Sequence, residues 1–332
     1  MAVAAVQPRR RRIAVVDGLA GDHELLAPLA ERFELIFHDG VPRDEDELVR
    51  RARGADVVLT QALKARFTAG VLEQLAGTQL LVTRNAGYDN IDVAAATACG
   101  ICVAHVPGGS APAVAELAFA GLLMLLRHLG RADREMRRGV YDHAPYFGAE
   151  LYGKTMGIIG FGRIGQHAAR IARGFGMRVL AWARRSHGEE ARALGVTEVS
   201  LDELLAEAHV VSLHVALTPE TENLLDARRL QRMRPGAVLI NTARGALVDE
   251  DALYRGLVSG RLGGAVLDVF AEEPPPLDHP LLSLDNVVVT PHIGWYTRET
   301  LLRQVEEIGR IIDGFYAGRP RHIVNPQAIG RR

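Results

Sequence analysis

The sequence predicts an α/β protein made of two doubly wound, parallel-sheet domains. Short apolar strands and helices alternate along the whole chain, and a glycine-rich loop follows the first strand of the second group of elements. Such alternation favours parallel sheets, because each crossover helix packs on a face of the sheet. The chain has 332 residues, which suggests about two domains of roughly 150 residues each.

The first group of elements covers the N-terminal third of the chain. Strands are expected at 13–17, 56–59, 80–82 and 101–104, each a short run of apolar residues. Helices are expected at 24–33, 68–75 and 93–99. Thr68 is a suitable N-cap for the second of these helices.

The second group begins after an apolar helix at 113–127. Its strands are expected at 155–159, 178–182, 210–214, 237–241, 264–267 and 287–290, with a helix at 164–175. A last helix at 297–316 is expected to return to the first domain. We therefore expect one domain from 1–112 with 297–332, and a second, inserted domain at 113–296.

Composition excludes several classes of function. Hydrophobic residues make up 48% of the chain, charged residues 24%, and the net charge is −1, so nothing points to a nucleic-acid partner. The longest apolar run, 117–126, is shorter than the roughly 18 residues that span a membrane. With no signal peptide visible, we expect a cytoplasmic protein without a membrane partner.

Cysteine and histidine patterns do not predict a metal site. Cys99 and Cys102 have C-x-x-C spacing, so a redox pair is one interpretation. Cys102 lies in a buried-strand pattern, which favours two small apolar fillers instead. The 12 histidines are scattered without a paired helical spacing.

The helix at 113–127 is apolar nearly all round, so it needs cover on every side. It is either fully buried in its domain or covered in part by a second subunit. We favour the second interpretation, a homodimer, because two-fold dimers are the commonest oligomers.

The glycine-rich loop predicts a dinucleotide site in the inserted domain. Gly160, Gly162 and Gly165 fit G-x-G-x-x-G between an expected strand and an expected helix. The first glycine permits the tight turn, the second lets a pyrophosphate approach the backbone, and the third lets helix and strand pack closely. Arg163 and Ile164 lie at the helix N-terminus, where the phosphates would bind.

The turn after the next strand predicts which dinucleotide binds. An acidic residue is expected there, about 20 residues after the glycines, to bind the ribose 2′-hydroxyl. The chain has Ala183, followed by Arg184, Arg185 and Ser186. Because these donors suit a 2′-phosphate, we expect NADP(H) to be preferred and NAD(H) to remain possible.

Six ordered motifs make the chain similar to a known family. They are Ala86–Asp92, Gly160–Gly165, His214–Thr221, Asn241–Gly245, Leu267–Pro274 and Thr290–Gly294. With them the chain resembles the D-isomer-specific 2-hydroxyacid dehydrogenase family from about residue 56 to residue 326. The resemblance implies a Rossmann cofactor domain inserted into a flavodoxin-like substrate domain, and reduction of 2-oxo acids with a nicotinamide cofactor.

The resemblance also implies a catalytic set of Arg244, Glu273 and His292. A planar guanidinium suits a carboxylate next to a ketone, and Arg244 follows an expected strand end. Histidine titrates near neutral pH, so His292 suits a proton donor to the carbonyl oxygen. Glu273 is expected to hydrogen-bond to the imidazole and favour its protonated form. Glu272 is the adjacent alternative, but Glu273 and Pro274 form the matching pair.

Further site residues follow from the matched motifs. Besides the glycine loop and the turn from Ala183 to Ser186, the cofactor is expected to contact His214, Thr221, Ala243, Asp268 and Gly294. The substrate is expected to contact Arg84, Ala86, Gly87, Arg244, His292 and Trp295. Within this set, backbone N–H groups at Ala86 and Gly87 take the carboxylate, and Arg84 adds positive charge.

The expected activity is that of a glyoxylate or hydroxypyruvate reductase that uses NADPH. A D-lactate or aromatic or branched D-2-hydroxyacid dehydrogenase using NAD(H) is the alternative enzyme, with Trp295 as the wall of a larger pocket. An NAD(H)-binding corepressor-like protein is an alternative of another class, since such proteins share the fold and the catalytic residues.

Overall fold

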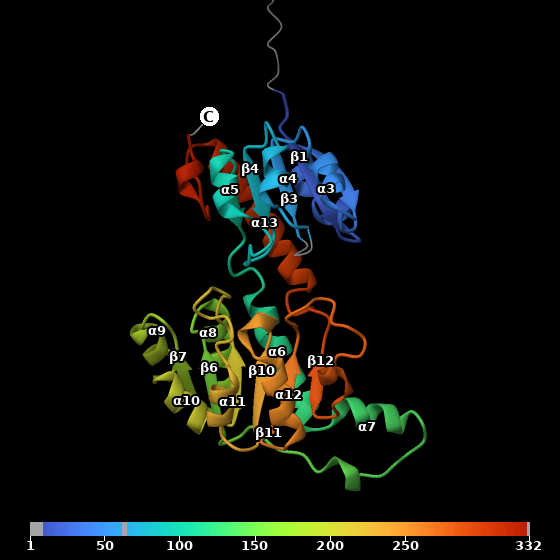
Figure 1. The fold of residues 1–332 in the computed structure, drawn as a ribbon, viewed down its shortest axis with the longest axis vertical. Coiled ribbons are helices and arrows are strands. Elements are labelled where there is room, and N and C mark those ends of the chain that lie inside the picture. The colour runs from blue at the N-terminus through green and yellow to red at the C-terminus, as the bar shows by residue number, and fades with distance from the viewer. Residues whose placement is uncertain (1–8, 62–64, 331–332) are drawn as a thin grey trace, which may run out of the picture. The chain divides into compact units, whose positions relative to one another are not determined.

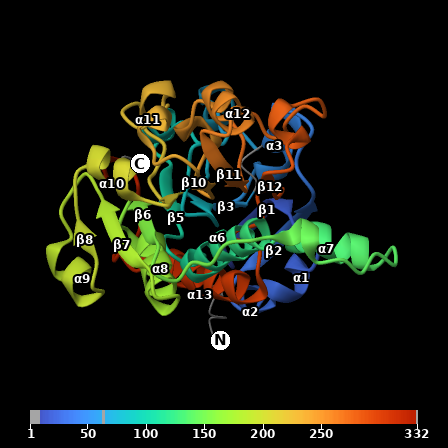
Figure 2. The ribbon, with the colours of Figure 1, turned by 90° about the horizontal axis from the view of Figure 1, so that it is seen from below.

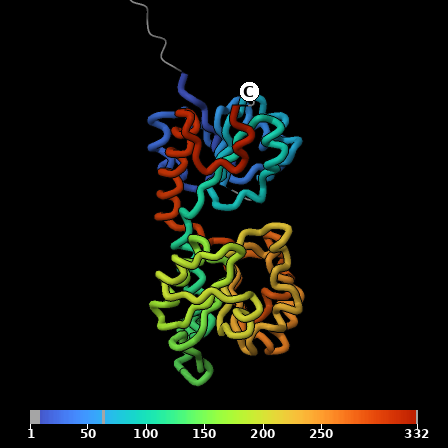
Figure 3. The backbone as a smooth tube through the Cα atoms, turned by 90° about the vertical axis from the view of Figure 1, so that its left-hand side faces the viewer, coloured from blue at the N-terminus to red at the C-terminus, as the bar shows by residue number. Residues whose placement is uncertain are grey.

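The computed structural model describes residues 9–61 and 65–330, which form two compact units. Unit 1 runs up to Gly109 and resumes at Arg298, and unit 2 is Ser110–Thr297. Figure 3 shows the chain passing into unit 2 once and returning once. The domain limits expected from the sequence, at 112/113 and 296/297, fall close to these boundaries.

Unit 1 contains a five-stranded sheet of order β2-β1-β3-β4-β5 in which every pair of neighbours is parallel. Residues of α3, α4 and α5 pack on one face, and residues of α13 pack on the other (Figure 1). The strands are β1 (Arg12–Gly18), β2 (Glu34–Asp39), β3 (Val57–Thr60), β4 (Leu80–Thr83) and β5 (Cys102–His105). The helices are α1 (Asp22–Leu25), α2 (Ala27–Ala30), α3 (Glu45–Ala52), α4 (Ala69–Glu73), α5 (Val93–Ala98), α13 (Arg298–Tyr316) and the 3-10 turn η4 (Pro326–Ala328).

Unit 2 contains a seven-stranded sheet of order β12-β11-β10-β9-β6-β7-β8, again entirely parallel. The strands are β6 (Thr155–Ile159), β7 (Arg178–Trp182), β8 (Thr197–Glu198), β9 (Val210–Leu213), β10 (Ala237–Asn241), β11 (Leu262–Leu267) and β12 (Val287–Val289). The connecting elements are α6 (Ala111–Leu126), α7 (Leu129–Met136), η1 (Ala144–Tyr146), α8 (Arg163–Gly174), α9 (Gly188–Ala193), α10 (Leu201–Glu207), α11 (Ala227–Arg232), η2 (Gly245–Leu247), α12 (Glu250–Val258) and η3 (Pro280–Ser283).

Helices cover both faces of the unit 2 sheet. Figure 2 shows α11 and α12 on one side and α6 and α8 on the other, and the two apolar clusters of the unit divide in the same way. The strand orders of units 1 and 2 match the flavodoxin-like and Rossmann patterns respectively. The predicted fold, two doubly wound parallel-sheet domains, is therefore confirmed.

Local structure departs from the prediction at a few elements. The helix expected at 24–33 is wrong: the chain forms the separate short helices α1 and α2. Pro28 has no N–H to continue the hydrogen-bond ladder, so the helix is interrupted before it. No prediction was made from the sequence for the strands β2 and β8 or for the helices α3, α7, α9, α10, α11 and α12. Thr68 does cap α4, accepting a hydrogen bond from Val71 N–H.

Among the described residues, no single helix is long and apolar enough to cross a membrane. The bent pair α6 and α7, at 62°, passes that test together by length and composition alone. Helix α6 buries one side against the unit 2 sheet, through residues that include Phe119 and Leu122. Both cysteines are free, and Cys102 packs in the unit 1 core.

A buried ion pair in unit 1 joins the residue after β4 to the first residue of α1. The guanidinium of Arg84, directly after β4, donates through Nη1 to Asp22 Oδ2 at 2.7 Å. Their side chains are 0% and 2% exposed. Asp22 Oδ2 also accepts from Leu19 N–H. The charge of Arg84, which was expected from the sequence to add to the substrate site, is thus buried and paired with Asp22 inside unit 1.

Removing one member of this pair should destabilise unit 1 strongly. Arg84→Ala leaves the Asp22 carboxylate buried without its cation, so we expect the free energy of unfolding to fall by about 3 to 5 kcal/mol. The measurement is urea unfolding, with the exposed Arg50→Ala as control. The double variant Asp22→Leu, Arg84→Met should recover most of the loss. A loss below about 1 kcal/mol for Arg84→Ala would show that the pair behaves like a surface pair.

Candidate active site

A pocket in unit 2 opens where the strand order reverses. Strands β7 and β9 flank β6, and the loops after these three strands meet at the carboxyl edge of the sheet. In open α/β sheets ligands bind at this point. The cavity measures about 490 Å³ and is lined by Gly160, Phe161, Gly162, Ala183, Arg184, Arg185, His187, His214, Val215 and Ala216.

Two glycines of the loop after β6 are required because other backbone atoms lie too close to leave room for a side chain. Gly160 has φ 100°, and a Cβ there would lie 2.5 Å from the His214 carbonyl oxygen. A Cβ at Gly165 would lie 2.1 Å from the Gly160 oxygen. Gly162 is different: it precedes α8 as the N-cap and faces open space. The loop and the helix N-terminus therefore form a cradle that fits a pyrophosphate, and the site residues fit a dinucleotide.

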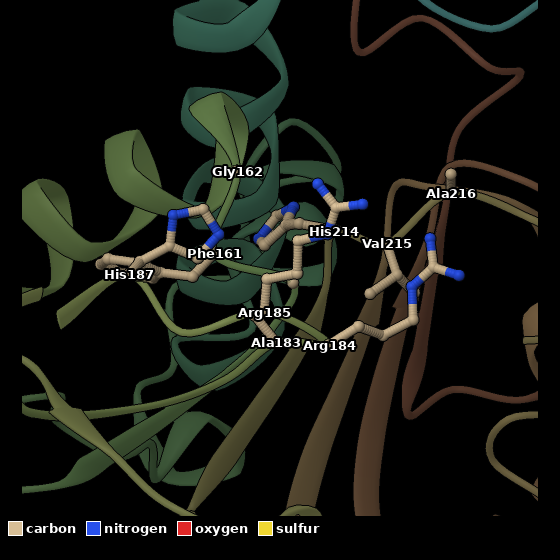
Figure 4. Close-up of a pocket in the computed structure, with 10 residues that line it drawn as sticks. Phe161, Gly162, Ala183, Arg184, Arg185, His187, His214, Val215 and Ala216 are labelled. Carbon is tan, nitrogen blue, oxygen red and sulfur yellow. The ribbon is translucent and has the colours of Figure 1, made fainter. Parts of the chain in front are cut away.

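The turn after β7 carries the basic residues (Figure 4). Arg184 and Arg185 are exposed and extend from this turn at the pocket. Ser186 is not a free donor, because its hydroxyl donates to Glu198 Oε2 at 2.7 Å. His187 N–H donates to Glu198 Oε1 at 2.7 Å. These two hydrogen bonds hold the pKa of Glu198 below its usual value, and the one from His187 N–H contributes most. Burial acts in the opposite direction.

The loop after β9 closes the other side of the pocket. Burial lowers the pKa of His214 to about 4, so its ring is neutral at pH 7, and its Nε2 lies 2.9 Å from Ser212 Oγ. The Thr221 hydroxyl accepts from Thr218 N–H and donates to the Ala216 carbonyl, both at 2.7 Å. Thr221 thus holds the shape of the loop.

Glu273 and His292, which lie 19 residues apart, are brought together. His292 Nδ1 and Glu273 Oε2 are 2.8 Å apart, and the second carboxylate oxygen accepts from Phe270 N–H at 3.1 Å. Burial works to raise the pKa of Glu273, but the hydrogen bond and charge of His292 outweigh it and the net pKa is lowered. The positive charge of Arg244 acts in the same direction. Since Nδ1 is engaged, Nε2 of His292 is the nitrogen left for a substrate.

Arg244 stands on a turn after β10 that its own neighbours brace. Asn241 Oδ1 accepts from Ala243 N–H at 3.1 Å, and Asn241 Nδ2 donates to the Arg244 carbonyl at 2.8 Å. The guanidinium donates through Nη1 to the Ala243 carbonyl at 2.7 Å. The turn is thereby fixed from within, and Arg244 is only partly buried.

Asp268, after β11, holds the turn that carries His292. Its Oδ1 accepts from the Thr290 hydroxyl at 2.6 Å and from Ile293 N–H at 2.8 Å, and its Oδ2 accepts from Gly294 N–H at 2.8 Å. Burial raises the pKa of Asp268, and these hydrogen bonds oppose the rise. Both oxygens thus have protein donors, a role beyond the cofactor contact expected from the sequence.

The other expected site residues lie in both units. Arg163 is exposed at the start of α8 beside the half-buried Ile164, and Trp295 is half-buried with its ring edge-on to Tyr296 at 5.0 Å. In unit 1, Ala86 is exposed and Gly87 half-buried after β4. His105 Nδ1 lies 2.8 Å from the Ala86 carbonyl.

Sequence reasoning missed several residues of the pocket and its supports. The cavity is also lined by Phe161, Val215 and Ala216, which lie inside matched motifs, and by His187, which follows the Ala183–Ser186 turn. These positions were the available signal. Glu198 gave no signal, because β8 has only two residues and Glu198 lies 12 residues from its partner Ser186. Within the described part of the chain, no group of three His, Cys, Asp or Glu side chains could hold a metal ion.

Comparisons with known proteins agree with this geometry. Residues 119–294 match the model of the D-isomer specific 2-hydroxyacid dehydrogenase, NAD binding domain. A glyoxylate reductase of Korarchaeum cryptofilum is 39% identical over 310 residues, covering 92% of this chain and 93% of that protein. A hydroxypyruvate reductase of Thermotoga maritima is 41% identical over 262 residues, covering 78% and 84%. An acyclic imino acid reductase solved with NADPH and D-Arg has a TM-score of 0.85 at 31% identity, covering 94% of this chain and 99% of that one.

The open space at Gly162 provides a test of the cradle. Because a methyl group at Gly162 meets no described atom within 4 Å, Gly162→Ala should fold with an unchanged melting temperature. The methyl would occupy space needed for the pyrophosphate, so we expect dinucleotide affinity to fall at least about tenfold, or 1.4 kcal/mol. The measurement is calorimetric titration with NADPH. Gly174→Ala at the far end of α8, also without a close neighbour, is the control, and equal affinities for both variants would contradict the cradle.

Proposed function

We propose that this chain, which belongs to the D-isomer-specific 2-hydroxyacid dehydrogenase family, reduces a small 2-oxo acid such as glyoxylate or hydroxypyruvate with NADPH. The protein is a nicotinamide-dependent oxidoreductase of that family. Relatives named glyoxylate reductase and hydroxypyruvate reductase support the substrate class. The observation that carries the proposal is the hydrogen-bonded pair of Glu273 and His292, with the charge of Arg244 acting on it.

Each catalytic side chain has a task that its geometry suits. Arg244 binds the substrate carboxylate and carbonyl oxygen through its planar guanidinium. The nicotinamide, when bound, supplies the hydride. His292 donates a proton from Nε2 to the carbonyl oxygen, because Nδ1 is held by Glu273. Glu273 keeps its negative charge at neutral pH and so favours the protonated imidazole that reduction requires.

Selectivity for NADPH is proposed to rest on Arg184 and Arg185. They extend from the turn where an acidic residue would bind a 2′-hydroxyl, and Ala183 leaves no carboxylate at that position. Ser186 contributes little as a donor, since its hydroxyl already donates to Glu198. The neighbour solved with NADPH is consistent with such a pocket in this fold.

A homodimer is proposed through unit 2. Several large apolar side chains of α6, α7 and the segment that follows are exposed, and exposed apolar surface of this kind favours an interaction site. The exposed members are Met124, Leu129, Met136, Val140, Tyr141, Phe147 and Tyr152. A second copy of the chain packed on this segment would cover the apolar side chains of α6 that its own unit leaves exposed.

Removing the two arginines should abolish the preference for NADPH. Each charge-assisted hydrogen bond contributes about 1.5 to 3 kcal/mol, so Arg184→Ala, Arg185→Ala should lower kcat/KM for NADPH by about 10²-fold or more. The value for NADH should stay within about threefold. The assay is absorbance at 340 nm with glyoxylate, hydroxypyruvate and phenylpyruvate. The exposed Arg170→Ala on α8 is the control. Equal kcat/KM of the unaltered protein for both cofactors would refute the preference.

Replacing the acid–base pair should separate the two roles. His292→Gln should lower kcat by about 10² to 10⁴-fold. Glu273→Gln removes the carboxylate that pairs with Nδ1 of His292, so the upper pH limit of reduction should move down. The measurement is the pH profile of kcat/KM for reduction, with the adjacent, exposed Glu272→Gln as control. No turnover of any 2-oxo acid, together with tight cofactor binding, would favour the corepressor-like alternative.

A further inference from the structure

A second carboxylate–imidazole pair lies behind the loop that carries Glu273. Glu250, the first residue of α12, accepts a hydrogen bond on Oε1 from Ala271 N–H at 2.9 Å. Its other oxygen, Oε2, lies 3.3 Å from Nε2 of His279. The two side chains are only 17% and 19% exposed. A carboxylate has no hydrogen to donate, so Nε2 of His279 carries the hydrogen of this bond.

The pair acts on the backbone two residues before Glu273. Phe270 N–H donates to Glu273 Oε1, and the Phe270 ring lies edge-on to His279 with ring centroids 5.3 Å apart. His279 Nδ1 is buried and has no hydrogen-bond partner among the described residues. The His279 ring is therefore held by Glu250 on one side and by Phe270 on another. Phe270 belongs to the Glu273 loop, and Glu250 binds that loop through Ala271 N–H.

The same loop rests directly on the Arg244 turn. A Cβ at Gly245 would lie 1.9 Å from the Phe270 carbonyl carbon and 2.1 Å from the Ala271 nitrogen. Contact this close is possible only for glycine. Glu250 is the first residue of α12, the helix that follows the Arg244 turn in the chain. It accepts a hydrogen bond from Ala271 N–H, the same peptide nitrogen that lies close to Gly245. One carboxylate thus ties the Glu273 loop, which lies against Gly245, to His279 at the start of η3.

We propose that Glu250 and His279 form a positioning pair for the reaction. The pair fixes the Phe270–Glu273 loop on the Arg244 turn, so that Glu273 meets His292 with its second oxygen held by Phe270 N–H. The inference rests on the proposed function, in which Glu273, His292 and Arg244 are the catalytic groups. Neither Glu250 nor His279 takes part in proton transfer to the substrate.

The test compares variants that keep or remove the acceptor at residue 250. Glu250→Ala frees the Ala271 N–H and lets Glu273 move, so we expect kcat to fall about 10- to 100-fold, as small misplacements do, with the KM for NADPH unchanged. The upper pH limit of reduction should move down, as in Glu273→Gln. Glu250→Gln keeps an acceptor oxygen and should restore most of the rate. Asp251→Asn, in the same first turn of α12 but exposed, is the matched control.

A second variant keeps the proposal testable if Glu250→Ala does not fold. His279→Phe preserves a ring against Phe270 and removes the hydrogen bond to Glu250, so it should lower kcat severalfold and move the pH limit the same way. An unchanged pH limit in the folded Glu250 and His279 variants would overturn the proposal, even if the melting temperature fell. If instead the unaltered protein turns over no 2-oxo acid, the proposed function itself fails, and if Glu273→Gln and His292→Gln leave reduction intact, the catalytic assignment fails. The two failures are therefore distinguishable.

Discussion

A buried carboxylate, that of Asp268, holds the turn on which the rest of the candidate site depends. His292 has φ 55°, a left-handed conformation that costs a non-glycine residue about 1 to 3 kcal/mol. Three hydrogen bonds converge on Asp268 from Thr290, Ile293 and Gly294, on both sides of His292. At about 1 kcal/mol or more for each, they offset the strain. The direction of the imidazole is thus set by a residue that comes from the neighbouring strand.

Close backbone contact supplies the second constraint. Gly294 approaches Asp268 so closely that a Cβ would lie 2.9 Å from Oδ2, and Gly245 lies under the Phe270–Ala271 peptide. These glycines let three loops after β10, β11 and β12 lie against one another at the carboxyl edge of the sheet. Arg244, Glu273 and His292 come from those loops. Their proximity follows from adjacent parallel strands ending at the same edge.

The sequence predicted what local patterns and motifs encode, and missed what depends on contacts between distant residues. The central strands were predicted because each has a run of buried apolar residues, and β6, β7 and β10 have the bounds that were expected. The edge strand β2 was missed because Glu34 and Asp39 bound a half-exposed segment. Arg84 was assigned to the substrate because its partner Asp22 lies 62 residues away. The bond between Ser186 and Glu198 gave no local signal either.

Two carboxylate–imidazole pairs in one unit show why residue type alone does not identify a catalytic group. In both pairs one ring nitrogen faces a glutamate, at 2.8 Å for His292 and 3.3 Å for His279. The pairs differ in the surroundings of the ring nitrogen that does not face the glutamate. Nδ1 of His279 is buried, so it can exchange no proton with a ligand. His292 stands on a left-handed turn at the carboxyl edge of the sheet, where ligands bind in such folds. The Glu250–His279 pair can fix a backbone, whereas only the Glu273–His292 pair is placed to move a proton.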